Sequence, residues 1–249
     1  MPPSVPASIR QQQHPLIRDL ADTIETIWQQ HLDLSPYHLP EGLGYIEGRL
    51  EGDRLVIENA CYQTPQFRKL HLELAKVGRN LDILHCVMFP RSEYPLPMFG
   101  TDLVGSAKRI NAAIVDLSPV EQSAGEWFLP SGYQSALGML PDLEFSQPRD
   151  LPEWGSIFSE FCLFVRPGNE AEQGQFLARV RDMLTIHCQQ AVATAPAPER
   201  RSEIAAGQRH YCLRQQQNDK TRRVLEAAFD PHWAERYLST VLFDLPSDS

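Results

Sequence analysis

The chain has 249 residues and a formal net charge of −9, with 42% hydrophobic and 22% charged residues. This is the composition of an ordinary globular protein, and the negative charge argues against a nucleic-acid partner. No segment has the ~18 consecutive apolar residues of a membrane-spanning helix, and the N-terminal residues lack the apolar stretch of a signal peptide. We therefore expect a cytoplasmic protein with no membrane partner.

The predicted elements begin with a disordered tail over residues 1–13 and a helix over residues 15–31. In that helix the apolar residues Ile17, Leu20, Ile24 and Trp28 recur at helical spacing. Strand-like runs then follow in close succession, at residues 45–50, 55–60, 70–75, 81–89, 98–104 and 110–117. The links between them are too short for parallel crossovers, which predicts antiparallel pairing.

Helices dominate the second half of the chain. After a short helix near residues 133–140 and one more strand at 161–166, helical patterns cover residues 169–192, 200–216, 221–229 and 233–242. The order of helix, sheet meander and helices predicts the α+β class. We expect an α/β/α sandwich, with a central antiparallel sheet flanked by helices on both faces, as a single domain over residues 14–249 and as a monomer.

Ionisable residues occur where the strand pattern predicts apolar side chains. Strand residues alternate between two faces, so His71 and Glu73 share a face, and His85 lies in the middle of an apolar face of the next strand. Asp102 follows in the strand after that. Each of these residues alone is more often a hydrogen-bonded structural residue, but the four together predict a pocket lined by proton donors and acceptors.

The sequence lacks the motifs that hold common cofactors. It has no Gly-x-Gly-x-x-Gly, Walker A, Gly-x-Ser-x-Gly or His-Glu-x-x-His sequence, and none of its five cysteines forms a Cys-x-x-Cys pair. We therefore expect no metal site. A carboxyl group buried on an apolar sheet face has a raised pKa and can act as a general acid, and a histidine exchanges protons near neutral pH. The residues themselves predict a proton-transfer pocket without a visible cofactor.

Two segments are locally basic despite the negative net charge. Residues 199–223 contain seven basic and three acidic residues, and residues 68–79 contain Arg68, Lys69, Lys76 and Arg79 against one acidic residue. The usual meaning of such a run is a solvated face. The alternative is a docking surface for an acidic partner, to which Lys69, Lys76 and Arg79 would contribute.

Five long segments resemble the ferredoxin-dependent bilin reductases. They cover residues 41–52, 56–69, 71–78, 81–90 and 217–225, and include His71-Leu-Glu-Leu-Ala-Lys-Val-Gly78. The similarity extends from about residue 15 to the C-terminus. It implies a central antiparallel sheet between helical layers, with biliverdin IXα between the sheet and the C-terminal helices. Electrons would arrive singly from an acidic, reduced [2Fe-2S] ferredoxin docked on the basic segments, and the enzyme would bind no metal or flavin of its own.

The resemblance also implies a reaction and a set of roles. Four electrons and four protons would convert biliverdin IXα to phycocyanobilin through bilin radicals, with the D-ring exovinyl group reduced before the A-ring. Asp102 would be the central proton donor, His85 its hydrogen-bonded partner and Glu73 the donor to the exovinyl group. The remaining matched positions would support or bind the bilin: His71, Asn218, Asp219, Lys220 and Arg149.

Within this set the roles differ. His71 would support the His85 network, Asn218 and Asp219 would line the pocket, with Asp219 near the A-ring, and Lys220 and Arg149 would pair with the propionates. Two other classes remain open at this stage. One is a bilin-binding or chromophore-carrier protein without catalysis, and the other is an acidic scaffold with a satisfied polar core.

Overall fold

A long antiparallel meander forms the centre of the molecule, which we describe from a computed structural model over residues 8–123 and 125–246. The sheet is built from β1 (Ser35–Pro36), β2 (Tyr45–Leu50), β3 (Asp53–Gln63), β4 (Phe67–Val77), β5 (Leu81–Pro90), β6 (Met98–Ser106), β7 (Arg109–Ser118) and β10 (Leu163–Val165). Its order is β1-β3-β4-β5-β6-β7-β10, with β2 also paired to β3. The predicted antiparallel sheet is confirmed, and β8 (Glu121–Ser123) with β9 (Glu126–Phe128) forms a separate hairpin.

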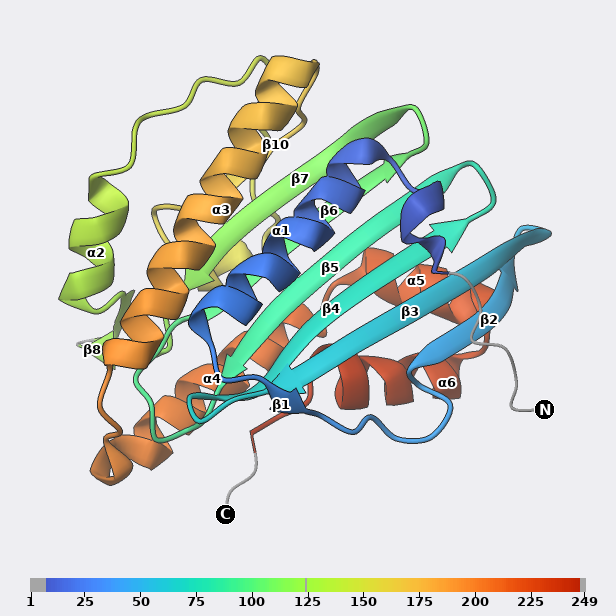
Figure 1. Cartoon of the computed structure of the whole chain (residues 1–249). Coiled ribbons are helices and arrows are strands. Elements are labelled where there is room, and N and C mark those ends of the chain that lie inside the picture. Colours follow the sequence, from blue (N-terminus) through green and yellow to red (C-terminus); the bar gives the residue numbers. More distant parts are fainter. Residues whose placement is uncertain (1–7, 124, 247–249) are drawn as a thin grey trace.

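Helices cover both faces of this sheet, as predicted (Figure 1). On one face lie α1 (Pro15–His31) and α3 (Glu170–Ala193), with α2 (Ser131–Gly138) packed against α3. The other face is covered by α4 (Arg201–Gln215), α5 (Asp219–Ala228), α6 (Pro231–Tyr237) and the π-helical turn η4 (Leu238–Leu242). The result is the three-layered α/β/α arrangement.

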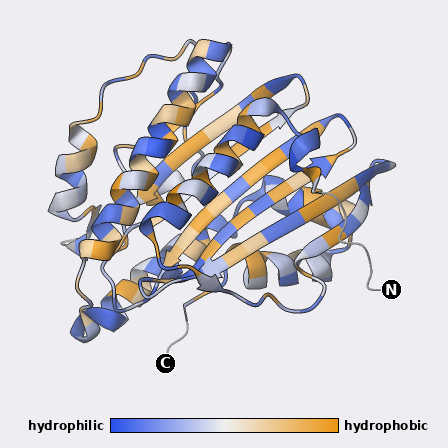
Figure 2. Ribbon diagram, in the orientation of Figure 1, coloured by the Kyte–Doolittle hydropathy of each residue, from blue (hydrophilic) through white to orange (hydrophobic). Residues whose placement is uncertain are grey.

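The two layers of helices bury opposite faces of the same strands. Leu70, Leu72 and Leu74 of β4 belong to the apolar core under α1 and α3, whereas Ala75 and Val77 belong to the core under the C-terminal helices. Nearly every residue of β4 and β5 is therefore buried. Figure 2 shows the corresponding hydrophobic bands along the central strands. A polar side chain in the middle of these strands has little water around it and needs a partner within the protein.

The N-terminal helix follows simple rules. Pro15 occupies its first turn, where a proline is tolerated, and the side chain of His14 accepts a hydrogen bond from the Leu16 amide. Ile17, Leu20 and Trp28 are fully buried against the sheet. This apolar stripe holds the helix against the sheet.

The prediction of a disordered tail over residues 1–13 is wrong for its second half, and residues 1–7 lie outside the described residues. The short helix η1 (Ile9–Gln12) is capped by Ser8, and Ile9 is 5% exposed. The Gln13 side chain donates to the carbonyl oxygens of Ala75 at 2.9 Å and Ile83 at 3.1 Å. Polar residues that bond to the backbone of the central strands leave no apolar periodicity, so composition alone misses this contact.

Candidate functional site

Three of the predicted residues form a row across the centre of the sheet. In the strand register Glu73 of β4 is opposite His85 of β5, and His85 is opposite Asp102 of β6. Directly paired residues of antiparallel strands point to the same face. All three side chains therefore meet on the face covered by the C-terminal helices, as the alternation of polar and apolar residues predicts.

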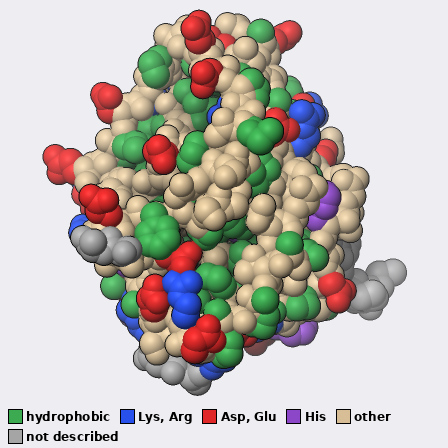
Figure 3. Space-filling view, turned by 90° about the vertical axis from the view of Figure 1, so that its left-hand side faces the viewer, with side chains coloured by type: hydrophobic (Ala, Val, Ile, Leu, Met, Phe, Trp, Pro, Cys, Tyr) green, Lys and Arg blue, Asp and Glu red, His purple; other side chains and the backbone are tan. Residues whose placement is uncertain are grey.

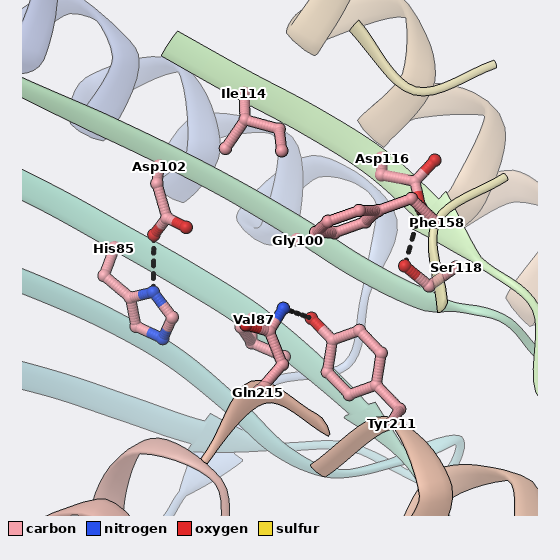
Figure 4. A pocket seen from close by; sticks show the side chains of 10 residues that line it. All are labelled: His85, Val87, Gly100, Asp102, Ile114, Asp116, Ser118, Phe158, Tyr211 and Gln215. Carbon is pink, nitrogen blue, oxygen red and sulfur yellow. Dashed lines mark hydrogen bonds and ion pairs between the residues drawn. The ribbon is translucent and has the colours of Figure 1, made fainter. Parts of the chain in front are cut away.

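His85 and Asp102 form a charge-assisted hydrogen bond. The Nδ1 atom of His85 donates to Oδ1 of Asp102 at 2.5 Å (Figure 4). Burial disfavours the charged imidazole, but the adjacent Asp102 carboxylate outweighs it and raises the pKa of His85. The Asp102 side chain is 41% exposed whereas that of His85 is 11% exposed, so the carboxylate is the more accessible end of the pair. The pair can hold a proton near neutral pH and present it to a bound molecule.

Glu73 is a buried carboxyl group with one hydroxyl partner. Its Oε2 atom accepts a hydrogen bond from the hydroxyl of Tyr237 at 2.5 Å. Burial raises the pKa of Glu73, although nearby His85 and the Tyr237 hydrogen bond oppose the rise. A carboxyl group shifted in this direction keeps its proton closer to neutral pH, as a general acid requires.

His71 lies beside the row rather than in it. It is paired with Val87 in the register, and its ring centre is 5.7 Å from that of His85 in an edge-on arrangement. Its Nε2 atom is hydrogen-bonded to Oδ1 of Asn59 at 2.7 Å. Burial, with Lys69 and His85 nearby, places the pKa of His71 well below its ordinary value. His71 is therefore a neutral donor to Asn59.

A small cavity adjoins the row on the side of Asp102. Its volume is about 10 Å³, and it is lined by His85, Val87, Gly100, Asp102, Ile114, Asp116, Ser118, Phe158, Tyr211 and Gln215 (Figure 4). Tyr211 and Gln215 enter from α4 and are joined by a 3.1 Å hydrogen bond. The cavity is bounded on one side by the sheet and on the other by helix α4. A planar ligand inserted between sheet and helices would meet Asp102 and His85 there.

Comparison with known proteins identifies the family to which the chain belongs. The sequence profile described as ferredoxin-dependent bilin reductase matches residues 21–244. The chain belongs to the ferredoxin-dependent bilin reductases. It is 59% identical over 237 residues to the phycocyanobilin:ferredoxin oxidoreductase of Trichodesmium erythraeum (strain IMS101), covering 95% of this chain and 96% of that protein.

Two further similarities support the family and the fold. The chain is 55% identical over 251 residues to the phycocyanobilin:ferredoxin oxidoreductase of Synechococcus elongatus (strain ATCC 33912 / PCC 7942 / FACHB-805), covering both chains completely. The crystal structure of a tomato phytochromobilin synthase in complex with biliverdin has the same fold, with a TM-score of 0.71 and 16% identity. That match covers 95% of this chain and 83% of the tomato protein.

In this bilin reductase the other predicted bilin contacts lie outside the row. Asn218 caps α5 through the Lys220 amide, and exposed Asp219 pairs with Arg223 at 3.2 Å. Lys220 is likewise exposed. Arg149 donates to the Asn111 carbonyl of β7 at 2.8 Å. None of these four predicted contacts is among the residues that line the cavity.

The docking role predicted for Lys69 and Lys76 is wrong. The Lys69 side chain is 0% exposed; its ammonium group donates to the Val241 carbonyl at 2.7 Å and is paired with Asp244. Lys76 is 13% exposed and is paired at 2.7 Å with the buried Asp82. Lys69 and Lys76 point to opposite faces of a strand that helices cover on both sides, so both are turned inward, which a charge count does not detect. Arg79, in the turn between β4 and β5, is exposed.

Several site residues were missed by the sequence interpretation. Asp116 is 1% exposed and accepts hydrogen bonds from Ser118 and Ser159, each at 2.6 Å. Strand alternation puts it on the same face as Asp102's partner Ile114, so this signal was present. Asn59 is opposite Glu73 in the pairing of β3 with β4, so the strand register could have found it. Tyr237 gave no such signal, because it meets Glu73 only through tertiary packing.

The described parts of the chain contain neither a cluster of metal-binding side chains nor a membrane-spanning helix. Within residues 8–123 and 125–246 there is no cluster of three or more His, Cys, Asp or Glu side chains arranged to hold a metal ion. The cysteines described there are all free thiols. Nor is any helix of these ranges sufficiently long and apolar to span a bilayer.

Proposed function

We propose that this bilin reductase converts biliverdin IXα to phycocyanobilin with four electrons from reduced [2Fe-2S] ferredoxin. The observation that carries the proposal is the row of Glu73, His85 and Asp102 on three adjacent strands, in a chain that is 59% identical to a phycocyanobilin:ferredoxin oxidoreductase. The bilin would lie between the sheet and the C-terminal helices. The proposal keeps the monomeric, cytoplasmic enzyme expected from the sequence.

The chemistry divides between the electron donor and the row. Reducing one carbon–carbon double bond consumes two electrons and two protons, so two double bonds account for the four of each. Ferredoxin supplies the electrons one at a time, and the conjugated bilin itself carries each unpaired electron. The residues of the row supply protons at fixed positions, which is the contribution that a rigid strand can make.

The row supports three separate roles. Asp102, being its most exposed member, donates to the conjugated centre of the bilin, and His85 returns a proton to Asp102 through their hydrogen bond. Glu73, buried and with a raised pKa, donates to the D-ring exovinyl group, which is reduced before the A-ring. His71 remains neutral and orients its neighbours.

The four predicted residues outside the row fit the periphery of such a complex. Asn218 and Asp219 start helix α5, with Asp219 directed to the A-ring, and Lys220 and Arg149 pair with the two propionates. Charge-assisted hydrogen bonds to carboxylates suit Arg and Lys at the rim of a pocket. In the present structure these side chains lie outside the cavity, so this part of the proposal requires the C-terminal helices to adjust around the bilin.

Ferredoxin docking is proposed on the exposed basic side chains that remain. These are Arg79 and members of the 199–223 segment, because Lys69 and Lys76 are engaged inside the protein. The face around α2 has acidic side chains spread over it, with few Lys or Arg among them (Figure 3). An acidic ferredoxin would avoid that face. The affinity should fall as salt rises and should weaken in Arg79→Ala; an affinity indifferent to both would rule out this surface.

An anaerobic turnover assay with product identification tests the function. With reduced ferredoxin, wild-type protein should form phycocyanobilin, whereas Asp102→Asn should still bind biliverdin but stall after partial reduction, with turnover lowered about 10²- to 10⁴-fold. A non-catalytic carrier would change the biliverdin spectrum on binding and then stop. A scaffold would cause no spectral change. Full turnover by Asp102→Asn would remove this residue from the mechanism.

A further inference from the structure

A chain of hydrogen bonds approaches Glu73 from outside the row. The Tyr237 hydroxyl donates to Oε2 of Glu73 at 2.5 Å and lies 2.9 Å from Nδ2 of Asn59. The Oδ1 atom of Asn59 is 2.7 Å from Nε2 of His71. We call this series, His71–Asn59–Tyr237–Glu73, the Tyr237 chain. It connects strands β3 and β4 with helix α6 at the buried side of the site.

The donor directions along the Tyr237 chain follow from its two ends. Tyr237 has a single hydroxyl hydrogen, and giving it to Glu73 leaves its oxygen to accept from the amide of Asn59. The Asn59 oxygen then accepts from the neutral imidazole of His71. Each member thus donates to the next, which fixes both the His71 tautomer and the oxygen of Glu73 that is occupied.

The members of the Tyr237 chain are held by independent contacts. The Tyr237 side chain is 0% exposed and its ring stacks on Trp233, with centres 4.9 Å apart and planes 15° apart. Trp233 in turn stacks on Phe229 at 3.9 Å. Asn59 also donates to the Leu43 carbonyl at 2.8 Å. Because these stacked rings hold Tyr237 in place, its hydroxyl has a fixed position and can orient the carboxyl group to which it bonds.

We propose that Tyr237 and Asn59 are positioning residues for Glu73 that aim its free oxygen, Oε1, at the exovinyl group. This proposal rests on the function proposed above. In the transfer, the Oε1–H bond of Glu73 breaks and a C–H bond forms on the vinyl carbon, with electrons that ferredoxin has delivered to the bilin. The carboxylate left behind is stabilised by the Tyr237 hydroxyl, so the positioning group also serves the product state.

Removing the Tyr237 hydroxyl has a predictable effect on protonation. Burial is the largest influence on Glu73 and raises its pKa, while His85 and Tyr237 lower it and Asp102 raises it. Without the hydroxyl, the pKa of Glu73 rises further. The titratable groups packed near Glu73 from the surrounding elements are His71, Lys69, His85, Asp102, Cys61 and Tyr237 itself. Only the Tyr237 contribution is removed by a change to phenylalanine.

Tyr237→Phe tests the proposal, with Tyr133→Phe as its matched control. Tyr133 is also buried, and its hydroxyl bonds to His187 at 2.9 Å on the opposite face of the sheet. We expect Tyr237→Phe to slow exovinyl reduction about 10- to 100-fold with little change in KM, and to move the alkaline limb of its pH profile upward. Tyr133→Phe should do neither. In a Glu73→Gln background, Tyr237→Phe should have no further effect.

Two results would overturn the positioning role. One is a Tyr237→Phe enzyme with the wild-type rate and alkaline limb, and the other is an equal loss with and without Glu73. Infrared titration of the Glu73 carboxyl band, assigned with Glu73→Gln, gives a readout that needs no turnover. The band should persist to higher pH in Tyr237→Phe, and an unmoved band would contradict the proposal. Failure of the wild type to reduce biliverdin would instead reject the proposed function and leave this titration to decide the role of Tyr237.

Discussion

Asp244→Asn should destabilise the protein by about 3 kcal/mol, whereas Lys69→Met should cost less than about 1 kcal/mol. The two residues form one ion pair, but their surroundings differ. The Lys69 side chain is 0% exposed and that of Asp244 is 21% exposed. Asp244 also pairs with Arg68. Loss of the Asp244 carboxylate leaves the buried Lys69 ammonium without an opposite charge. Loss of the Lys69 ammonium leaves Asp244 paired with Arg68.

The magnitudes follow from this asymmetry. Breaking a buried pair by removing one partner costs about 3–5 kcal/mol because an uncompensated charge remains. We place Asp244→Asn at the lower end, since the Val241 carbonyl still accepts from Lys69 at 2.7 Å. Methionine has nearly the length of lysine and no charge to desolvate. It can pack beside Phe89, over whose ring the Lys69 ammonium lies at 4.2 Å.

The pH dependence has a defined sign. Burial lowers the pKa of Lys69 below 10.5, and Asp244 opposes this. Without Asp244 the pKa of Lys69 falls further, so the native state binds fewer protons than the unfolded state over a wider range below 10.5. Stability then rises with pH through that range. The deficit of Asp244→Asn should therefore be largest near pH 7 and shrink toward pH 9.5.

Urea unfolding of the wild type and both variants between pH 7 and 9.5 measures these differences. Asp142→Asn, at an exposed position, controls for the loss of an acidic side chain. Equal costs for the two substitutions, or an Asp244→Asn deficit that does not change with pH, would refute a buried ammonium group that depends on Asp244. Phe243, the neighbour of Asp244 in sequence, packs on His85 with ring centres 5.4 Å apart, so this ion pair lies next to the row.

Two other changes test the packing around the site. In Gly207→Ala the new Cβ would lie 1.9 Å from the carbonyl oxygen of Val120, a backbone atom, so we expect a loss of about 3 kcal/mol. Gly174→Ala has open space and should stabilise its helix by about 0.5–1 kcal/mol; thermal unfolding that ranks the two equally would contradict this. Burial raises the pKa of Asp116 to about 6 from 3.8, so the Asp116 contribution to wild-type stability should fall by about 2 kcal/mol as pH rises from 4 to 6. Asp116→Asn should lack that decline in urea unfolding, and an unchanged slope would assign it to other groups.

The register of the first central hairpin could be predicted from the sequence. The turn at residues 77–81 pairs Val77 with Leu81, and moving four residues back along each strand places Glu73 opposite His85. Strand alternation supplied the face. The position of Asp102 was less determined, because β5 and β6 are joined by a longer link over residues 91–97 whose length does not fix a register. Its place opposite His85 is therefore information from the structure.

Contacts between distant segments were beyond the sequence patterns. Asn59 and Tyr237 are 178 positions apart, and nothing in the local sequence of either predicts that the two side chains form a hydrogen bond. The docking role predicted for Lys69 was wrong for a related reason. A charged residue on a strand is usually solvated, and its burial here depends on Asp244 arriving from the far end of the chain. Local periodicity predicts elements and faces, whereas partners of buried polar groups depend on the tertiary arrangement.

The placement of the row across strands has a consequence for its chemistry. Directly paired side chains on neighbouring strands lie roughly 5 Å apart, close enough for each charge to influence the next in a poorly solvated setting. Asp102 raises the pKa of His85. Protonated His85 lowers the pKa of Glu73, whereas Asp102 raises the pKa of Glu73. A proton lost from one member therefore changes the proton affinity of the others. In the proposed four-electron reduction, this coupling would link the successive proton deliveries from the row, and the strand register would supply it without a mobile loop.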